Sequence, residues 1–302
     1  MINRVTHVTA QRTVLANLQL NLGRMTDLQA RMSGGKVITK PSDDPAGTAS
    51  ALRLRADQRI TEQYARNAAD GVGWLTSVDS SLQTAVTNLR QARNLTVQAA
   101  STGAASDATR NAIATELEGL RDALLEQANT SFLGRSVYAG TSSAGAAFTV
   151  DVDADGNRTY SWTGSDTGSV QRRIGPATTV RADADGKAIF GDGDDSIFAL
   201  IDTIAKEIRS GAEVTGRLAD LDARMQTMLG ELADVGTRYG QLTTAQKSTA
   251  AALSELKGQL SAIEDIDLAE VIVELQSQEV AYQAALGAAS RVLQPSLMDF
   301  LR

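Results

Sequence analysis

The feature that most constrains the fold is a long series of residues spaced alternately by three and four positions in the second half of the chain. It runs from Leu218 to Ile263 and is mostly apolar. This spacing is typical of a helix with one narrow apolar seam, as in coiled coils. Such a helix needs partners to pack on, so the sequence predicts a helical bundle. The first seam residues are Leu218, Leu221, Met225, Met228, Leu232, Val235, Tyr239 and Leu242.

Segments earlier in the chain supply the partner helices. Leu75 to Ala92 and Ile113 to Leu124 carry the same spacing, and isoleucines resume it over 197–208. Between the first two, Ser101 to Arg110 is rich in small polar residues, and Asp107 is a suitable N-cap. We predict a mainly α fold, a long antiparallel helical rod or bundle formed by both terminal halves of the chain.

The middle of the chain has a different character. Gly, Ser, Thr and Asp dominate from 139 to 195. AFTVDV alternates apolar and polar residues, DGN follows, and RTYSW alternates again, which predicts a β-hairpin with a tight turn. SVQRRI and TTVRAD resemble further strands. We predict a small β-rich domain over 139–195, inserted into a helical rod domain formed by 44–138 and 196–264.

Composition excludes several classes of function. The chain has no cysteine and one histidine, His7, so it has no disulfide and no site with several histidines. Its net charge of −7 argues against nucleic acid or an anionic membrane as the main partner. It has no run of about 20 apolar residues, and its first residues lack the apolar core of a signal peptide. We therefore expect that the protein is not an enzyme and binds no cofactor. If it is exported, we expect a route other than the one that a signal peptide directs.

One acidic motif favours an alternative. Asp151, Asp153, Asp155 and Gly156 spell the start of an EF-hand calcium loop, but its twelfth position holds Trp162 where a bidentate Glu is needed. The flanks are predicted strands, so a hairpin turn is the better interpretation. A calcium-binding secreted adhesin or enzyme that uses the acidic insert is the alternative from another class of proteins.

Both ends of the chain carry apolar seams without an obvious cover. We predict that 1–40 and 265–302 are terminal coiled-coil segments that bury these seams in an assembly. Glu279 interrupts the second seam. The predicted assembly residues are Leu15, Leu18, Leu22, Met25, Leu268, Ile272, Leu275, Tyr282, Leu286 and Leu293.

The two ends also differ in charge. Met1 to Lys40 has six Lys or Arg against one Asp, which gives +5, and 264–302 has seven acids against two Arg, which gives −5. If the ends pair antiparallel, Lys36 and Lys40 lie near Glu264, Asp267 and Glu270, and the charges help to set register and partner choice. The alternative is two unrelated solvated faces.

The stretch KPSDDPAG, from Lys40 to Gly47, separates two predicted helices. Proline disfavours helical geometry in the residue before it and is accepted at the first helical position. Asp44 is then the N-cap, Pro45 the first helical residue, and Asp43 a further acid at the positive end of the helix dipole. We predict that Pro41, Asp43, Asp44 and Pro45 form a hinge between segments, not a metal or catalytic site.

SGGKVITKPSDDPAGTASALRLRAD resembles the signature of the flagellin superfamily. The helical stretch that begins NAADGVGWL and the ending SRVLQPSLMDFLR also resemble that superfamily. The proline on each side of the acidic pair is more similar to the hook–filament junction proteins of the superfamily than to filament flagellins. A short filament flagellin is the closest alternative.

The resemblance implies a non-enzymatic structural adaptor of the bacterial flagellum. Such a protein is exported unfolded by the flagellar type III apparatus, and its terminal segments are mobile in the monomer. It forms a ring of copies that joins another junction protein on the hook side to flagellin. The resemblance also implies an export chaperone that binds the C-terminal region and an extracellular location.

Overall fold

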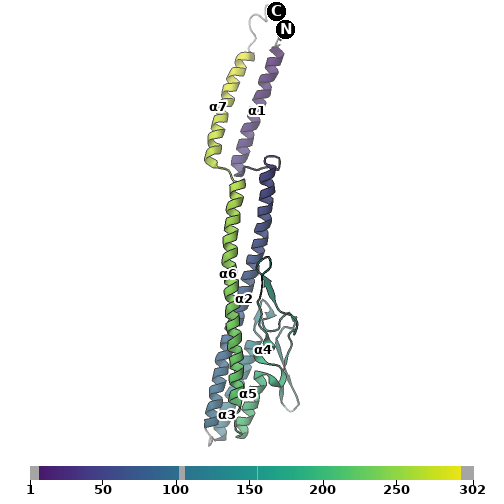
Figure 1. Ribbon diagram of the computed structural model, residues 1–302, viewed down its shortest axis with the longest axis vertical. Helices are drawn as coiled ribbons and strands as arrows, with labels where there is room; N and C mark the ends of the chain where they lie inside the picture. The colour runs from purple at the N-terminus through teal and green to yellow at the C-terminus, as the bar shows by residue number, and fades with distance from the viewer. Residues whose placement is uncertain (1–6, 102–105, 155, 294–302) are drawn as a thin grey trace, which may run out of the picture. The chain divides into compact units, whose positions relative to one another are not determined.

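The computed structural model describes residues 7–101, 106–154 and 156–293, and these form two compact units. One unit combines Met1–Ile60 with Leu253–Arg302, and the other is Thr61–Ala252. We call them the terminal unit and the bundle unit. The helices α2 and α6 contribute residues to both (Figure 1).

The described residues are mainly helical, which confirms the predicted fold class. The helices are α1 (His7–Gly34), α2 (Pro45–Ser101), α3 (Asp107–Ala128), α4 (Gly186–Phe190), α5 (Ile197–Ser210), α6 (Arg217–Glu264) and α7 (Leu268–Leu293). Helix α3 begins one residue earlier than expected, because Ser106 and not Asp107 is the N-cap and accepts a hydrogen bond from the Thr109 N–H. In the described part of the chain, no helix is long and apolar enough to span a membrane.

The strands form three antiparallel pairs. They are β1 (Ser131–Phe132) with β2 (Arg135–Ser136), β3 (Phe148–Val152) with β4 (Arg158–Trp162), and β5 (Gln171–Arg173) with β6 (Thr179–Arg181). The second pair is the predicted hairpin, with Val150 opposite Tyr160. Its turn is closed by Asp153, which accepts hydrogen bonds from the backbone N–H and side-chain amide of Asn157.

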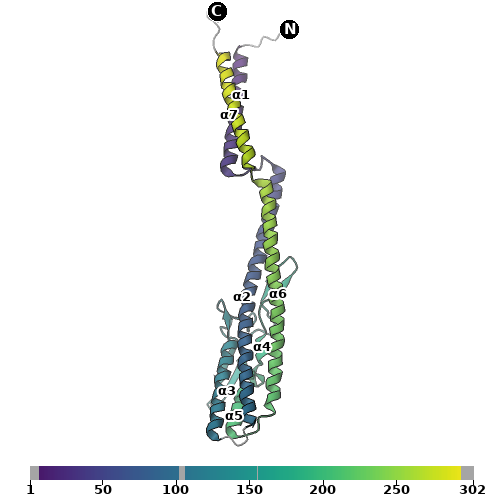
Figure 2. The same cartoon turned by 90° about the vertical axis from the view of Figure 1, so that its left-hand side faces the viewer.

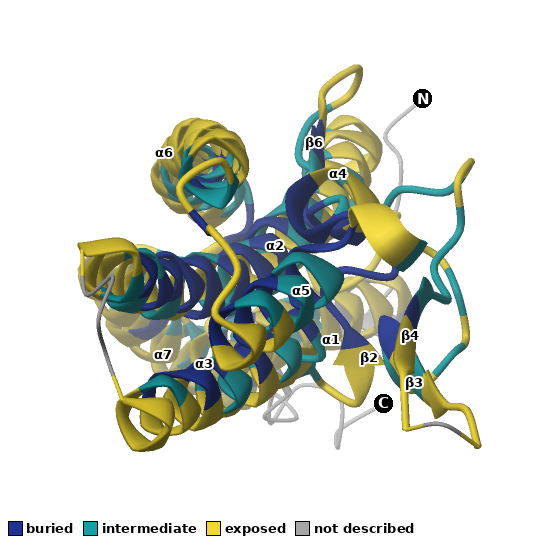
Figure 3. Ribbon diagram, turned by 90° about the horizontal axis from the view of Figure 1, so that it is seen from below, coloured by how far each residue is buried: buried dark blue, intermediate teal, exposed yellow. Residues whose placement is uncertain are grey.

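Helical seams form the core of the bundle unit. On α6, Leu221, Met228, Val235 and Leu242 are fully buried at intervals of seven, as the predicted seam requires. Helices α2, α3 and α5 turn their buried faces toward one another (Figure 3). The four isoleucines of α5, all buried, pack into the same core. Burial of these seams at about 25 cal/mol per Å² of apolar surface is the main stabilising term.

The β-rich segment shares this core. Tyr138, Phe148 and Tyr160 are buried together with Phe190 and Phe198 of the following helices. Neighbouring rings lie 5.2 to 5.9 Å apart between centroids, within the range for favourable aromatic pairs. The predicted insert 139–195 therefore belongs to the bundle unit by packing, and its boundaries as a separate domain stay a prediction.

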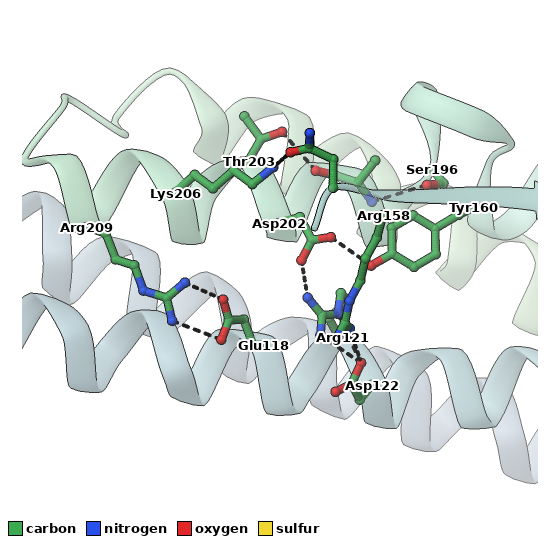
Figure 4. Close-up of polar contacts among 12 residues, drawn as sticks. Glu118, Arg121, Asp122, Arg158, Tyr160, Ser196, Asp202, Thr203, Lys206 and Arg209 are labelled. Atoms are coloured by element: carbon green, nitrogen blue, oxygen red, sulfur yellow. Dashed lines mark hydrogen bonds and ion pairs between the residues drawn. The ribbon is translucent and has the colours of Figure 1, made fainter. Parts of the chain in front are cut away.

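A polar network ties β4 to α3 and α5 (Figure 4). The buried guanidinium of Arg121 forms ion pairs with Asp202 and Asp122, and the Tyr160 hydroxyl donates to Asp202 over 2.7 Å. Burial lowers the pKa of Arg121, but the hydrogen bonds to Asp202 and Asp122 outweigh it and leave the pKa raised. Burial and the hydrogen bond to Asp202 together raise the pKa of the Tyr160 hydroxyl, so this hydroxyl stays protonated and can donate to Asp202 at neutral pH.

Candidate assembly surface

Helices α1 and α7 lie side by side and antiparallel in the terminal unit (Figures 1 and 2). Each contributes a seam of buried or half-buried residues spaced by three and four. On α1 the seam is Val14, Leu18, Asn21, Met25 and Leu28, and on α7 it is Val271, Leu275, Gln278, Tyr282, Ala285 and Ala289. This regular alternation is the geometry of a two-helix coiled coil.

The middle of this seam is polar. The side-chain amide of Gln278 donates to the backbone carbonyl of Asn21 at 3.3 Å and to its side-chain carbonyl at 3.4 Å. A polar pair at one seam position of a coiled coil disfavours other registers, because a shift would leave both amides without a partner. Asn21 and Gln278 thus fix how α1 and α7 align.

The predicted assembly residues divide into two groups. Leu18, Met25, Leu275 and Tyr282 lie in the seam between α1 and α7. Leu15, Leu22, Ile272 and Leu286 are exposed, by 52%, 45%, 39% and 43% respectively. We call these four the apolar strip. Leu268 is also exposed, and the side chain of Leu293 lies outside the described residues.

The apolar strip lies on one flank of the helix pair. Leu15 and Leu22 directly follow the seam residues Val14 and Asn21, and Ile272 and Leu286 hold the equivalent positions on α7. In an antiparallel pair such positions meet on the same side. Glu279 follows Gln278 and therefore belongs to this flank, so it interrupts the strip and not the α1–α7 seam. In the described part of the chain, no element covers the apolar strip, which is exposed apolar surface.

The connections from α1 to α2 and from α6 to α7 are tied to each other. Lys36 and Asp265 form an isolated antiparallel bridge, in which the Val37 N–H donates to the Glu264 carbonyl at 2.6 Å and the Ile266 N–H donates to the Gly35 carbonyl at 3.2 Å. We call this contact the joint. Gly35 has a φ of +64°, which glycine adopts at little cost.

Charges reinforce the joint. The Lys36 ammonium lies 2.6 Å from Asp265 and 3.4 Å from Glu264, and the buried Glu264 also pairs with Arg55 at 2.8 Å. The hydrogen bond to Asp265 raises the pKa of Lys36, and that bond and the Ser261 hydroxyl lower the pKa of Asp265.

The predicted pairs of Lys36 and Lys40 with Asp267 and Glu270 are not seen in the chain. Asp267 caps α7 instead, by accepting from the Ala269 N–H at 2.9 Å, and Lys40 has no ion-pair partner among the described residues. A cap satisfies helix N–H groups that have no partner within the helix, which competes with an ion pair to lysine. The predicted pairs remain a prediction for the assembled state.

The hinge residues adopt the predicted local geometry. Asp44 accepts from the N–H groups of Ala46 and Gly47 at 3.0 and 2.9 Å, which makes it the N-cap, and α2 begins at Pro45. Asp43 turns the other way. The Thr39 hydroxyl and the Lys40 N–H donate to it and lower its pKa. The two carboxylates therefore close a turn and start a helix, and Pro41 is exposed. A hinge motion stays a prediction.

We expect Lys36→Glu to loosen the joint. The substitution places three carboxylates together, so the Val37 and Ile266 amides should exchange with deuterium several-fold faster in the purified full chain. Adding Asp265→Lys should restore part of the protection. Lys40→Glu is the matched control, because it makes the same change of charge four residues away, at a lysine that forms no ion pair with Glu264 or Asp265. Equal protection in all three variants would show that the charges do not hold the joint.

No group of three or more acids or histidines in the described residues could hold a metal ion. Asp153 instead uses its carboxylate for the hairpin turn, and Asp155 lies outside the described residues. The proposed calcium alternative therefore gains no support from the geometry of the hairpin.

Known proteins resemble this chain along most of its length. Residues 5–143 match the family model for the bacterial flagellin N-terminal helical region. Flagellar hook-associated protein 3 of Salmonella typhimurium is 28% identical over 299 residues, which cover 88% of this chain and 91% of that protein. The protein of the same name from Escherichia coli is 31% identical over 248 residues, covering 78% of this chain and 69% of that protein.

A solved structure supports the fold. That of a flagellar hook-associated protein from Vibrio parahaemolyticus aligns with a TM-score of 0.66 and 21% identity, and covers 74% of this chain and all of that one.

Proposed function

The chain belongs to the family of flagellar hook-associated protein 3, within the flagellin superfamily, and we propose that it joins the hook side of the bacterial flagellum to the flagellin filament. The family consists of structural components of the flagellum. Two relatives of the same name match most of the chain. The prolines on both sides of Asp43 and Asp44 are more similar to the junction branch than to a short filament flagellin.

One structural observation supports the proposal independently of the names of the relatives. The terminal unit presents the apolar strip on the same helix pair whose seam is already satisfied within the chain. Such a surface gains free energy only when another protein covers it, at about 25 cal/mol per Å² of apolar area removed from water. Self-association into a ring, with another junction protein and flagellin as neighbours, provides that cover.

The export route and the chaperone follow from the same family membership. We propose that the chain is exported unfolded through the flagellar type III apparatus, that a chaperone holds its C-terminal region before export, and that it works outside the cell. The paired helices α1 and α7 are then the state that forms as the strip is covered. No catalytic role is assigned.

A deletion strain tests the function. Cells without this protein are expected to carry hooks without filaments and to shed flagellin into the medium, because flagellin has no surface on which to assemble. Electron microscopy of the cells and a gel of the medium measure both effects, and a plasmid copy of the wild-type chain is the control. Filaments of normal number and length in the deletion strain would exclude the proposed function.

A further inference from the structure

The joint and the α1–α7 seam share one antiparallel register. Asn21 lies 15 residues before Lys36 in the chain (21 to 36), and Gln278 lies 13 residues after Asp265 (265 to 278). At about 1.5 Å per residue of helix, the two arms that lead from the bridge to the polar pair differ in length by only about 3 Å, which is less than one helical turn. The seam therefore continues the alignment that the bridge begins.

The joint closes without help from the seam. The two backbone hydrogen bonds and the ion pairs described above involve no seam residue of α1 or α7. Glu264 is only 5% exposed, and Lys36 and Arg55, from two separate elements, both pair with it. A carboxylate at such a site is costly unless a cation accompanies it. These pairs therefore favour the closed joint before α1 and α7 meet.

We propose that the joint starts the pairing of α1 with α7, and that it selects both the register of the pair and the helix that fills the α1 seam. A closed joint holds Leu28 and Val271, the first seam residues on each side, about two helical turns from the bridge. Segments tied together at such a short distance meet at an effective concentration of about 1 mM. At about 1 µM protein, α7 of the same chain is thus favoured about a thousandfold over α7 of another copy. Pairing then spreads toward Val14 and Ala285, and cover over the apolar strip completes it.

Gly35 allows the joint to be opened without a change of charge. Its φ is +64°, a conformation in which a β-branched residue is a strained outlier. Gly35→Val should therefore open the joint. Gly34→Val is the matched control, because Gly34 ends α1 with the ordinary backbone of a helix and a Cβ atom would meet nothing within 4 Å at either glycine. Only the backbone conformation separates the two variants.

Hydrogen exchange of the purified full chain tests where pairing starts. In the wild type, the protection of α1 amides should fall at least about fivefold from Leu28 to Val14, because the pair opens from the end that is farther from the joint. Gly35→Val should speed exchange around Asn21 about tenfold, and Lys36→Glu, which opens the joint by charge, should act in the same direction. Gly34→Val should stay within about twofold of wild type. Lower protection at Leu28 than at Val14, or unchanged exchange around Asn21 in both joint variants, would overturn the proposal.

A cross-linking experiment tests the choice of partner. Because the chain has no cysteine, Asn21→Cys with Gln278→Cys supplies the only two thiols, and the joint alone then marks the register. A short bismaleimide should join the two thiols within one chain and give a monomer of altered mobility on a denaturing gel. Adding Gly35→Val should raise the share of cross-linked dimers at least about fivefold, and adding Gly34→Val should leave that share unchanged. Equal shares with and without Gly35→Val would refute the proposal. These measurements need no filaments, so that result would leave the proposed junction function standing.

Discussion

A chain that ends at Asp265 is expected to build no filament junction and yet to keep its bundle unit folded. The truncation removes α7, and with it the partner of the α1 seam and half of the apolar strip. Helix α1 then exposes Leu18, Met25 and Leu28, and an isolated amphipathic helix of this length is marginal in water. Among the residues that the structure describes, the hydrophobic core of the bundle unit contains none beyond Leu242, so its packing is expected to be unchanged.

Two measurements on the truncated chain separate assembly from folding. In the deletion strain it should restore filaments in no more than about one hundredth of the cells that the full chain restores. The loss is large because every copy in the assembly lacks the same contact, so the losses multiply. In purified form its main cooperative unfolding transition should lie within about 2 °C of that of the full chain. The reason is that changes away from the core of the bundle unit have little effect on the stability of that unit. Restored filaments would contradict the assigned role of the terminal unit, and a large fall in the transition would show that α7 stabilises the bundle unit.

Regular patterns in the sequence predicted most of the fold. The spacing of Leu221, Met228 and Val235 is periodic over many turns, and the alternation around Tyr160 gave the hairpin with its correct partner strand. Helix starts were accurate where the cap chemistry is strong, as at Asp44 and Pro45. They were less so where two residues compete, because Ser106 and Asp107 are both good caps and only one can lie at the helix start.

The division of the terminal seams could not be read from spacing alone. Leu15, Leu18, Leu22 and Met25 alternate by four and three, and so do Val14, Leu18, Asn21 and Met25. The first set contains more apolar residues, but the structure buries the second, because Asn21 finds its partner in Gln278. The same shift moves Glu279 from the seam to the exposed flank. A polar residue in a seam is recognised only when its partner, 257 positions away, is known.

Contacts between distant residues were equally hidden. The cluster of five buried rings, Phe198 included, comes from β3, β4, α4, α5 and the segment after β2, although aromatic residues make up only 4% of the chain. Arg121 and Asp202 are 81 residues apart, and each alone resembles an ordinary exposed charge on a helix. Periodicity identifies which face of an element is buried, but it carries no information on which two polar residues meet there.

Arg121→Met is expected to destabilise the bundle unit by about 3–5 kcal/mol. The substitution keeps a long apolar stem but leaves Asp202 largely buried with only the Tyr160 hydroxyl as a described partner. The cost is therefore mainly that of an unpaired carboxylate in a site with little water. For a unit of this size the midpoint of thermal unfolding should fall by roughly 6–20 °C, since each kcal/mol corresponds to about 2–4 °C. Calorimetry of the purified full chain measures the shift.

The neighbouring pair offers a matched control. Arg209 of α5 pairs with Glu118 of α3, across the same two helices, but both side chains are about one-third exposed. Water replaces the lost partner there, so Arg209→Met should cost no more than about 1 kcal/mol. Adding Asp202→Leu to Arg121→Met should recover part of the loss, because removal of both charges leaves only the Tyr160 hydroxyl unsatisfied. Equal shifts for Arg121→Met and Arg209→Met would show that burial of the Arg121 pair does not stabilise the contact of β4 with α3 and α5.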